Sequence, residues 1–349
     1  MKILIIGGTG LISTAITRAL LERGDEVTIY NRGQSAIRFE GAVRRIIGDR
    51  RDAEQFEKQV REAGPFEVVI DMICYRPEEA ESTLRAVRGI AGQLIVCSTV
   101  DVYARPTRRF PIKEDEPRGG VSVYGKQKAM CEKVLLEAWE REGIPVTILR
   151  PAQTYGEGGP LIHSLGWSTT FFDRLRKGKP VIVHGDGQSL WCACHVEDVA
   201  AAFVGACGNE TSYGRCYNVT GEEWMTWDGY HQTVARAIGA PEPRLVHIPT
   251  EVLCAADERA IVCRENFQFN NIFDTSAARR DLGFAYTIAF EEGVRRTYAW
   301  LEAHGAIESS ETDPAYDRLV AAWEGCKEAF LAACRRGGEE GSNRGELKV

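Results

Sequence analysis

The feature that most constrains the fold lies at the start of the chain, where a short apolar run ends in closely spaced glycines. The run Ile3–Ile6 is followed by Gly7-Gly8-Thr9-Gly10-Leu11-Ile12-Ser13, and a helical pattern begins at once. Glycines permit a tight turn and let the backbone approach a pyrophosphate, which sits at the positive N-terminus of the helix. A strand before such a turn and a helix after it are the context that this motif requires. The sequence therefore predicts dinucleotide binding at Gly7, Gly10, Leu11 and Ile12.

The first 150 residues alternate short β-rich runs with helical periods. We expect strands at Lys2–Ile6, Glu26–Tyr30, Arg44–Ile47, Phe66–Asp71, Gln93–Ser98 and Val146–Leu149, with helices between them. Repeated βαβ units with almost entirely apolar strands are typical of a parallel sheet covered on both faces. The predicted fold class is α/β: a Rossmann-type doubly wound parallel sheet with a smaller C-terminal substrate-binding lobe.

The rhythm changes after Pro151, and this change suggests how the chain is divided. We expect an NAD(P)-binding domain over residues 1–155 and a mainly substrate-binding lobe over 156–310, interleaved with it through a returning strand near 215–220. Asp198 is expected to cap a helix that runs to about Ala206. A C-terminal helix is predicted over 311–334 and a flexible tail over 335–349.

Composition narrows the classes of partner. The net charge of −7 disfavours binding to phosphate backbones, so we expect no nucleic acid partner. The 11 cysteines are odd in number, scattered and without a CxxC pair, which indicates reduced thiols in a cytoplasmic protein and no metal site. No apolar stretch approaches the length of a membrane span, so no membrane partner is expected.

The ends of the second and third predicted strands bear on which dinucleotide binds. An acidic residue after the second strand would hydrogen-bond the ribose 2′-hydroxyl of NAD, but the chain has Asn31-Arg32-Gly33 there. Arg32 favours NADP weakly, since it would pair with a 2′-phosphate; stacking on adenine or facing solvent is the alternative. After the third strand, Asp49 and Arg50 are predicted to contact the cofactor, Asp49 through the adenine amino group, although a simple turn aspartate is nearly as good an interpretation.

A tyrosine and a lysine begin the helix predicted at Tyr124–Glu142. Tyr124 and Lys128 stand at i and i+4, so the phenol and the ammonium share one face. An ammonium beside a phenol, with a positive nicotinamide nearby, favours phenolate and lowers the tyrosine pKa. The pair would form a general base that removes an alcohol proton while hydride leaves. By itself this spacing occurs by chance in many proteins.

Several blocks in a fixed order make the pair more specific. They are Val96–Tyr103, Glu114–Pro117, the Tyr124/Lys128 helix, Leu149–Gly156, Val183–Gly187, His195–Val199 and Asp274–Gly283. With the glycine turn, these blocks resemble the extended short-chain dehydrogenase/reductase superfamily, in its group of NAD-dependent epimerases and dehydratases that act mostly on nucleotide sugars. The resemblance covers residues 1–304 and lies nearest a branch related to chloroplast stem-loop-binding proteins.

The resemblance implies roles for further residues. Thr99 matches the hydroxyl that bonds the reacting oxygen, while Tyr155 and Arg264 match positions that bind substrate, Arg264 through a diphosphate. Trp191 stands where many members place a second diphosphate-binding arginine, and it would stack on a base or sugar or pack in the core. Asp101 lies where elimination chemistry would need an acid; an aspartate satisfied by backbone amides is the alternative.

Three functions remain open on the sequence. The leading one is an NAD(P)-dependent nucleotide-sugar epimerase that works through a transient ketone. The second is a dehydratase or decarboxylase that uses Asp101, and the third is a non-enzymatic RNA-binding relative. The resemblance also implies a homodimer through the helices at 77–90 and 124–142, the first of which has an apolar stripe of Ala80, Leu84 and Val87 that would suit an interface or the core equally.

Overall fold

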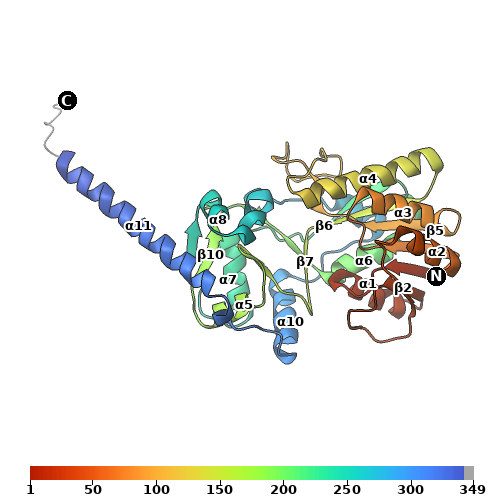
Figure 1. The fold of residues 1–349 in the computed structure, drawn as a ribbon, viewed down its shortest axis with the longest axis horizontal. Helices are drawn as coiled ribbons and strands as arrows, with labels where there is room; N and C mark the ends of the chain where they lie inside the picture. The colour runs from red at the N-terminus through yellow and green to blue at the C-terminus, as the bar shows by residue number, and fades with distance from the viewer. Residues whose placement is uncertain (342–349) are drawn as a thin grey trace.

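The computed structural model describes residues 1–341, and its centre is a single parallel sheet of seven strands (Figure 1). The strands are β1 (Lys2–Ile6), β2 (Glu26–Asn31), β3 (Arg44–Ile47), β4 (Phe66–Asp71), β5 (Ala91–Cys97), β6 (Val146–Pro151) and β13 (Arg215–Val219). They pair in the order β13-β6-β5-β4-β1-β2-β3, and every pair is parallel. The predicted Rossmann-type fold is confirmed, with the returning strand at one edge.

Helices cover both faces of this sheet because successive strand residues point to opposite sides. Ile3 and Ile5 pack with α1 (Leu11–Glu22) and α6 (Val196–Ala206) on one face. Leu4 and Ile6 point the other way, where α2, α3 and α4 lie. These three helices span Ala53–Ala63, Pro77–Val87 and Val123–Glu142. Burial on both faces explains why the strands are almost entirely apolar.

The smaller lobe follows β6 and is built from short strands and helices around an aromatic core. Its strands are β7 (Gln153–Tyr155), β8 (Ile162–His163), β9 (Gly166–Trp167), β10 (Val181–His184), β11 (Leu190–Trp191), β12 (Ala193–His195), β14 (Met225–Thr226) and β15 (Leu245–Ile248). Its helices are α5 (Thr170–Arg176), α7 (Trp227–Ala237), α8 (Thr250–Ala256) and α10 (Phe290–Ala303), and α9 (Ser276–Leu282) returns to the sheet beside β13. Short helical turns lie at Val100–Val102, Glu210–Ser212, Glu258–Ala260 and Ser310–Thr312, with a π-helical segment at Cys263–Phe267. The sheet and this lobe lie side by side in Figure 1.

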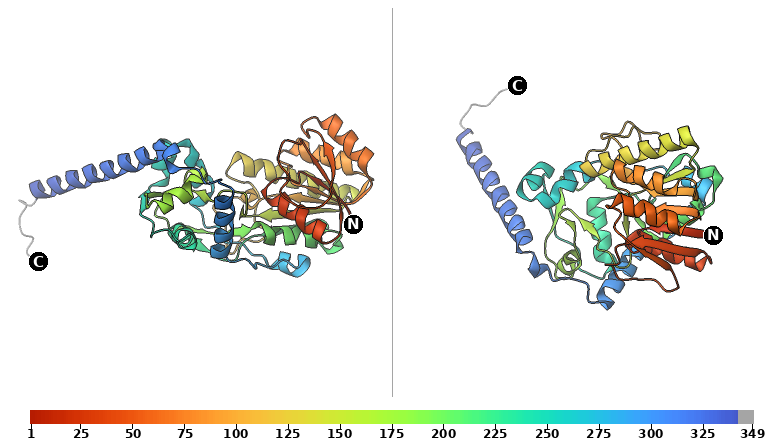
Figure 2. Two further views of the ribbon diagram at one scale, coloured as in Figure 1. Left: turned by 90° about the horizontal axis from the view of Figure 1, so that it is seen from below. Right: turned by 45° about the vertical axis from the view of Figure 1, so that its right-hand side comes forward.

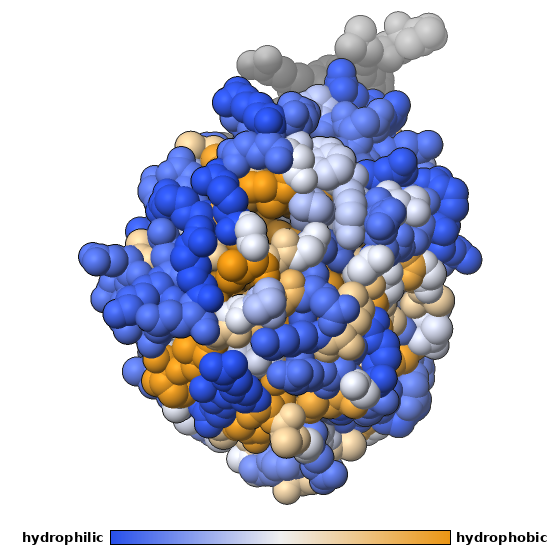
Figure 3. Space-filling view, turned by 90° about the vertical axis from the view of Figure 1, so that its right-hand side faces the viewer, coloured by the Kyte–Doolittle hydropathy of each residue, from blue (hydrophilic) through white to orange (hydrophobic). Residues whose placement is uncertain are grey.

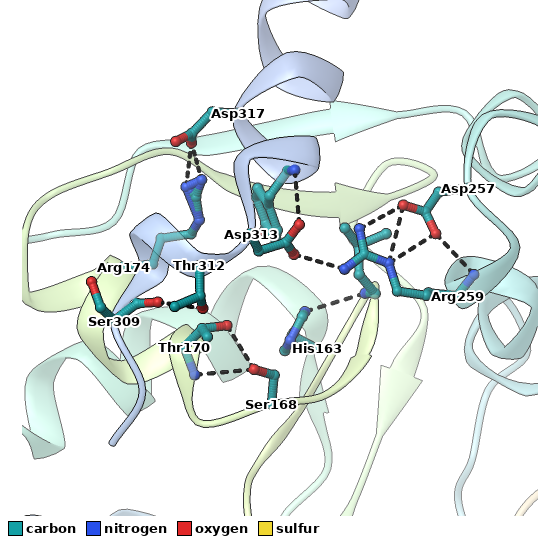
Figure 4. Close-up of polar contacts among 12 residues, drawn as sticks. His163, Ser168, Thr170, Arg174, Asp257, Arg259, Ser309, Thr312, Asp313 and Asp317 are labelled. Carbon is teal, nitrogen blue, oxygen red and sulfur yellow. Dashed lines mark hydrogen bonds and ion pairs between the residues drawn. The ribbon is translucent and has the colours of Figure 1, made fainter. Parts of the chain in front are cut away.

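The last helix, α11 (Pro314–Gly341), projects away from the lobe in every view (Figures 1 and 2). Its first two turns are anchored, since Tyr316 and Val320 are buried. In Figure 4, Asp317 faces Arg174, and Arg259 lies between Asp257 and Asp313 just before the helix. Beyond these contacts the helix continues through residues 335–341, where a flexible tail was predicted. The rest of that predicted tail, 342–349, lies outside the described residues.

One local prediction needs correction. Asp198 does not cap α6: the cap is His195, whose ring accepts a hydrogen bond from the backbone N–H of Glu197. The carboxylate of Asp198 instead accepts hydrogen bonds from the backbone amides of Thr287 and Ile288, at 3.0 Å each, and so fixes the loop before α10. A partner almost 90 residues away decided its role, which a local capping pattern does not reveal.

Of the two places open to the apolar stripe on α3, an interface or the core, the structure shows the core. Ala80, Leu84 and Val87 are buried in the core between α3 and the sheet. The surface at this end of the molecule is mainly hydrophilic, with hydrophobic side chains in separate groups (Figure 3). Among the helices of residues 1–341, none is both long and apolar enough to cross a membrane.

Candidate functional site

A long cavity of about 640 Å³ crosses the carboxyl ends of the strands. It begins at the glycine turn after β1, passes the ends of β2 and β3, and reaches the start of α4 near the ends of β5 and β6. In doubly wound sheets, ligands bind in the crevice at this edge, where the strand order reverses. The cavity is lined by all of the predicted cofactor residues: Gly7, Gly10, Leu11, Ile12, Asn31, Arg32, Asp49, Arg50 and Lys128.

The glycine turn has the geometry that a phosphate cradle needs. Gly8 has a φ of +92°, and a Cβ there would come within 2.6 Å of Ile29, so only glycine fits. Ser13 occupies the third glycine position and is not merely tolerated, since the Gly10 N–H donates to its Oγ at 2.9 Å. This bond holds the backbone at the start of α1, whose first N–H groups are the natural site for an anion.

The residues after β2 and β3 divide into exposed and buried groups. Asn31 shapes its turn by donating to the Gly7 carbonyl at 3.2 Å and accepting from Gly33 N–H at 2.9 Å. Arg32 is exposed along the cavity and makes no hydrogen bond or ion pair with the described residues. Asp49 is hydrogen-bonded to Arg51, which lowers the pKa of Asp49 to about 2. The guanidinium of Arg32 and the carboxylate of Asp49 both border the end of the cavity where an adenosine would lie.

Arg50 lines the long cavity, as a cofactor ligand would, but its side chain is bound within the protein. Its guanidinium is buried, pairs with both oxygens of Asp71 at 2.9 Å, and donates to the carbonyl of Glu79 and the hydroxyl of Thr83. These bonds tie the end of β4 to α3. Arg50 thus forms part of the cavity wall, and its charge is used within the protein.

Thr99, Tyr124 and Lys128 meet where the long cavity joins a second one. Thr99 and Tyr124 line both cavities, and Lys128 lines the long one. Their closeness depends on Gly125, which was not among the residues predicted from the sequence. A Cβ on Gly125 would lie 2.2 Å from the Asp101 carbonyl, so Gly125 lets α4 pack against the turn that carries Thr99. The structure therefore brings the predicted reacting groups together.

We expected Lys128 and a nearby positive nicotinamide to lower the Tyr124 pKa, and the residues of the protein alone do not lower it. Lys128 Nζ donates to the Cys97 carbonyl at 2.7 Å and lies 5.9 Å from the centre of the Tyr124 ring. The pKa of Tyr124 is raised, mainly because the surrounding protein desolvates the phenol, with smaller contributions from Cys97 and Asp101; interaction with Thr99 opposes them. The protein's own residues therefore keep the phenol protonated, as an acid in the reducing direction requires.

The position of α4 is fixed by a buried charge network behind the reacting groups. Glu132 accepts from Arg150 at 2.9 and 2.6 Å and from the Ser98 hydroxyl at 2.5 Å. Arg150 continues to the hydroxyl of Tyr103 at 2.9 Å. Glu132 stands one helical turn after Lys128, so these bonds hold the reactive face of α4 against β5 and β6.

The second, smaller cavity of about 380 Å³ lies between the end of the sheet and the C-terminal lobe. Its walls are mostly aromatic or aliphatic, and the lining residues are Thr99, Val100, Asp101, Tyr124, Ala152, Gln153, Ile162, Trp167, Trp191, Cys192, Val262, Asn266, Phe267, Asn271 and Phe273. Neither lysine nor arginine is among them.

The predicted substrate residues separate into three different environments. Trp191 forms part of the small cavity's wall, with its ring packed on Trp227 at 4.8 Å between centroids. Tyr155 needs correction, since it is buried in the lobe core and its hydroxyl donates to the Phe290 carbonyl at 3.3 Å. Arg264 does not line the cavity either; its half-exposed side chain lies 3.6 Å from Glu251.

Asp101 lies in the small cavity, close to the reacting groups. Asn266 donates to its Oδ1, and its other oxygen accepts no hydrogen bond from the described residues. Burial raises the pKa of Asp101, against the effects of Arg105 and the Asn266 bond. The prediction that an acidic group stands beside the reaction centre therefore agrees with its placement.

Several residues of the two cavities were missed from the sequence. Tyr75 follows β4 and stacks beneath Lys128, with Nζ 4.8 Å from its ring centre; its place after a strand end was an available signal. Asn266 and Asn271 come from the segment Glu265–Asn271, in which amides alternate with phenylalanines. This segment is π-helical and irregular, so no periodic pattern could have assigned its faces.

Comparisons with known proteins agree with this geometry. The sequence profile described as the NAD dependent epimerase/dehydratase family matches residues 3–220. A chloroplast stem-loop binding protein of 41 kDa from Arabidopsis thaliana is 30% identical over 85% of this chain and 78% of its own. The 2′-dehydrokanamycin reductase of Streptomyces kanamyceticus is 24% identical over 92% of this chain and 90% of its own.

Solved structures show the same fold at low sequence identity. The UDP-glucuronic acid 4-epimerase of Bacillus cereus in complex with NAD has a TM-score of 0.70 and 18% identity, over 87% of this chain and 99% of that one. The UDP-glucose 4-epimerase of Thermotoga maritima with UDP-glucose has a TM-score of 0.71 and 21% identity, over 87% and 99%. At such identities the likeness shows the fold alone.

Proposed function

Because the chain belongs to the NAD dependent epimerase/dehydratase family, we propose that it oxidises a secondary alcohol to a ketone, or reduces the ketone, on a sugar-type ring. The observation that carries this proposal is the meeting of Thr99, Tyr124 and Lys128 at the junction of the long and small cavities. A dinucleotide in the long cavity and a ring in the small one would face each other at this junction.

The residues present fit a dinucleotide. Gly8, with its positive φ, lets the turn pack directly against Ile29, and the Gly10–Ser13 bond orders the turn at the N-terminus of α1, which suits the pyrophosphate. Arg32, exposed and unpaired among residues 1–341, would reach the 2′-phosphate of NADP. We therefore propose NADP ahead of NAD.

The chain's own residues supply the proton chemistry. Tyr124 would take the proton of the alcohol, or return it to the ketone oxygen, while Thr99 would hydrogen-bond the same oxygen. A bound nicotinamide supplies the hydride acceptor or donor and, when oxidised, a positive charge. That charge and the Lys128 ammonium would together favour the phenolate, which the protein alone does not.

We propose epimerisation as the complete reaction. The transient ketone rotates in the site, and hydride then returns to its opposite face. The cofactor would then be regenerated within each cycle. A second candidate, dehydration or decarboxylation, is favoured by the placement of Asp101 in the small cavity beside Tyr124. The mass of the product separates them, because an epimer keeps the mass of its substrate.

The test begins with the ligand that accompanies the purified protein. Mass spectrometry after denaturation should find NADP or NAD, and its absence together with no measurable binding of either would contradict the proposal. Tyr124→Phe should then lower turnover by roughly 10²- to 10⁴-fold without changing dinucleotide affinity. Tyr213→Phe, outside both cavities, is the control.

Binding to RNA is tested in the same preparation. The Arabidopsis relative is named for stem-loop binding, but the net charge of −7 opposes attraction to phosphate backbones. We expect no RNA affinity with a steep salt dependence. Tight, salt-sensitive RNA binding that survives in Tyr124→Phe, with no turnover of any ring substrate, would replace the enzymatic proposal.

A further inference from the structure

The small cavity differs from a diphosphate site in its charge. Its only acidic side chain is Asp101, since the other polar lining groups are hydroxyls, amides and a thiol. Arg105 and Arg264, from neighbouring segments, are engaged elsewhere. Arg105 donates to the Asn270 carbonyl at 3.0 Å and to the Asn271 side chain, and Arg264 lies beside Glu251. A diphosphate entering this cavity would lose water without gaining a cation.

The same lining is suited to a flat, hydroxylated ring. Trp191 forms a buried wall, and Trp167, 54% exposed, stands on the β8–β9 hairpin at the cavity's edge. Aromatic faces pack against the apolar side of a ring, and they also attract cations. Gln153, Asn266 and Asn271 supply neutral donors and acceptors around it.

Asp101 adds one acidic side chain to these neutral polar groups. One carboxylate oxygen is held by Asn266, and the second accepts no hydrogen bond from the described residues although it belongs to a lining residue. The charged groups around it are Arg105, which attracts it, and Glu265, which repels it; Tyr124 faces it from α4. A ligand donor, above all a cationic one, would satisfy the second oxygen and offset the cost of burying the carboxylate.

We propose that the small cavity binds an unphosphorylated, hydroxylated ring that carries an amine, an amino sugar or aminocyclitol, with the ammonium on Asp101, and that it rejects nucleoside-diphosphate sugars. This inference rests on the proposed function, because it names the substrate of the same site. Asp101 is then a binding group, and the ketone chemistry stays with Thr99 and Tyr124.

The experiment measures binding, by calorimetry with the full chain saturated with NADP, of glucosamine, glucose and UDP-glucose. We expect glucosamine to bind at least about tenfold more tightly than glucose, and UDP-glucose to bind more weakly than both. In Asp101→Asn the preference for glucosamine over glucose should disappear, while NADP affinity is kept as the sign of a folded protein. Asp115→Asn, an exposed acid outside both cavities, should leave the preference unchanged.

The outcomes separate this inference from the proposed function. Tighter binding of UDP-glucose, an unchanged amine preference in Asp101→Asn, or no ring binding at all would overturn the inference, while NADP binding and the Tyr124→Phe effect would still support the oxidoreductase. Conversely, intact ring binding with no affinity for either dinucleotide would overturn the proposed function. A turnover readout sharpens the assignment, since Asp101→Asn should raise KM for the amine-bearing ring and leave kcat within about twofold.

Discussion

The two halves of the cleft offer a ligand opposite chemistry. The half built by the parallel sheet presents a glycine turn, a helix N-terminus, the free cation Arg32 and the ammonium of Lys128. The half that faces the C-terminal lobe presents tryptophans, phenylalanines and amides, and the sheet side adds a single carboxylate there, that of Asp101. Groups that suit a phosphate are therefore concentrated on the sheet side, whereas the side toward the lobe offers aromatic surfaces and neutral hydrogen-bonding groups.

The halves also differ in how they hold buried polar groups. In the sheet half, buried charges are paired, as in Arg150–Glu132 and Arg50–Asp71. In the lobe, the buried polar groups include three histidines with unpaired ring nitrogens, His163, His184 and His231. Removing one partner of a buried ion pair lowers the free energy of unfolding of the protein. A buried neutral histidine lowers that free energy when the pH falls. Substitutions in the ion pairs and unfolding at lowered pH therefore separate the two dependences.

The largest effect is expected from breaking the buried pair behind α4. Glu132→Gln leaves the Arg150 charge without its partner in a site where both side chains are 1% exposed. We expect a loss of about 3–5 kcal/mol in the free energy of unfolding, measured in urea. Glu137→Gln, on the same helix in exposed pairs with Lys133 and Arg141, should cost less than about 0.5 kcal/mol. Equal losses in the two variants would contradict the contrast.

The same contrast explains what the sequence could and could not predict. The sheet half follows from local signals: apolar strands, the glycine turn, and the i, i+4 spacing of Tyr124 and Lys128. Even there, local signals did not predict that the Arg50 side chain pairs with Asp71, because Asp71 comes from another strand. In the lobe such distant contacts decide almost everything: Tyr155 is buried by Phe290, 135 residues later. Strand ends predict position well, but they do not predict which charges the protein uses internally.

Acid is expected to weaken the lobe before the sheet half. Burial lowers the pKa of His163 and of His184 to about 4, while an unfolded histidine titrates near 6.5. Below pH 6.5 the histidines of the unfolded chain bind protons, whereas those of the folded lobe stay neutral. The free energy of unfolding is therefore at its full value above pH 6.5 and falls as the pH approaches 4. Each histidine should cost roughly 2 kcal/mol at pH 5.

Tryptophan fluorescence measures this loss selectively. Of the seven tryptophans, only Trp139 belongs to the sheet half, so the signal reports mainly on the lobe. Burial also holds the pKa of His231 well below its usual range, and neither ring nitrogen has a partner. His231→Phe should therefore make unfolding in urea less sensitive to pH between 6.5 and 5. An unchanged pH dependence would show that these histidines do not control acid stability.

A smaller effect is expected at the adenosine end of the long cavity. Arg32→Ala removes the exposed guanidinium that would pair with a 2′-phosphate, so NADP affinity should fall about tenfold while NAD affinity stays within about twofold. Fluorescence titration with the two reduced dinucleotides measures both. Arg44→Ala, at the amino end of β3 and outside the cavity, is the matched control. Equal losses for both dinucleotides would mean that Arg32 contacts a part common to both.

The smallest effect is expected at the exposed end of the lobe, where α11 leaves the body. Glu324 pairs with Arg244 at 2.7 Å, but the side chains are 41% and 57% exposed, so water and salt screen the pair. Glu324→Gln should cost between about 0.2 and 1 kcal/mol, and the difference should vanish in concentrated salt. Val320→Ala, one turn earlier and buried, should cost more and be insensitive to salt, because it removes apolar contact. If Glu324→Gln proved as costly as Glu132→Gln, ion pairs would contribute alike in both halves, and the division drawn between them would be lost.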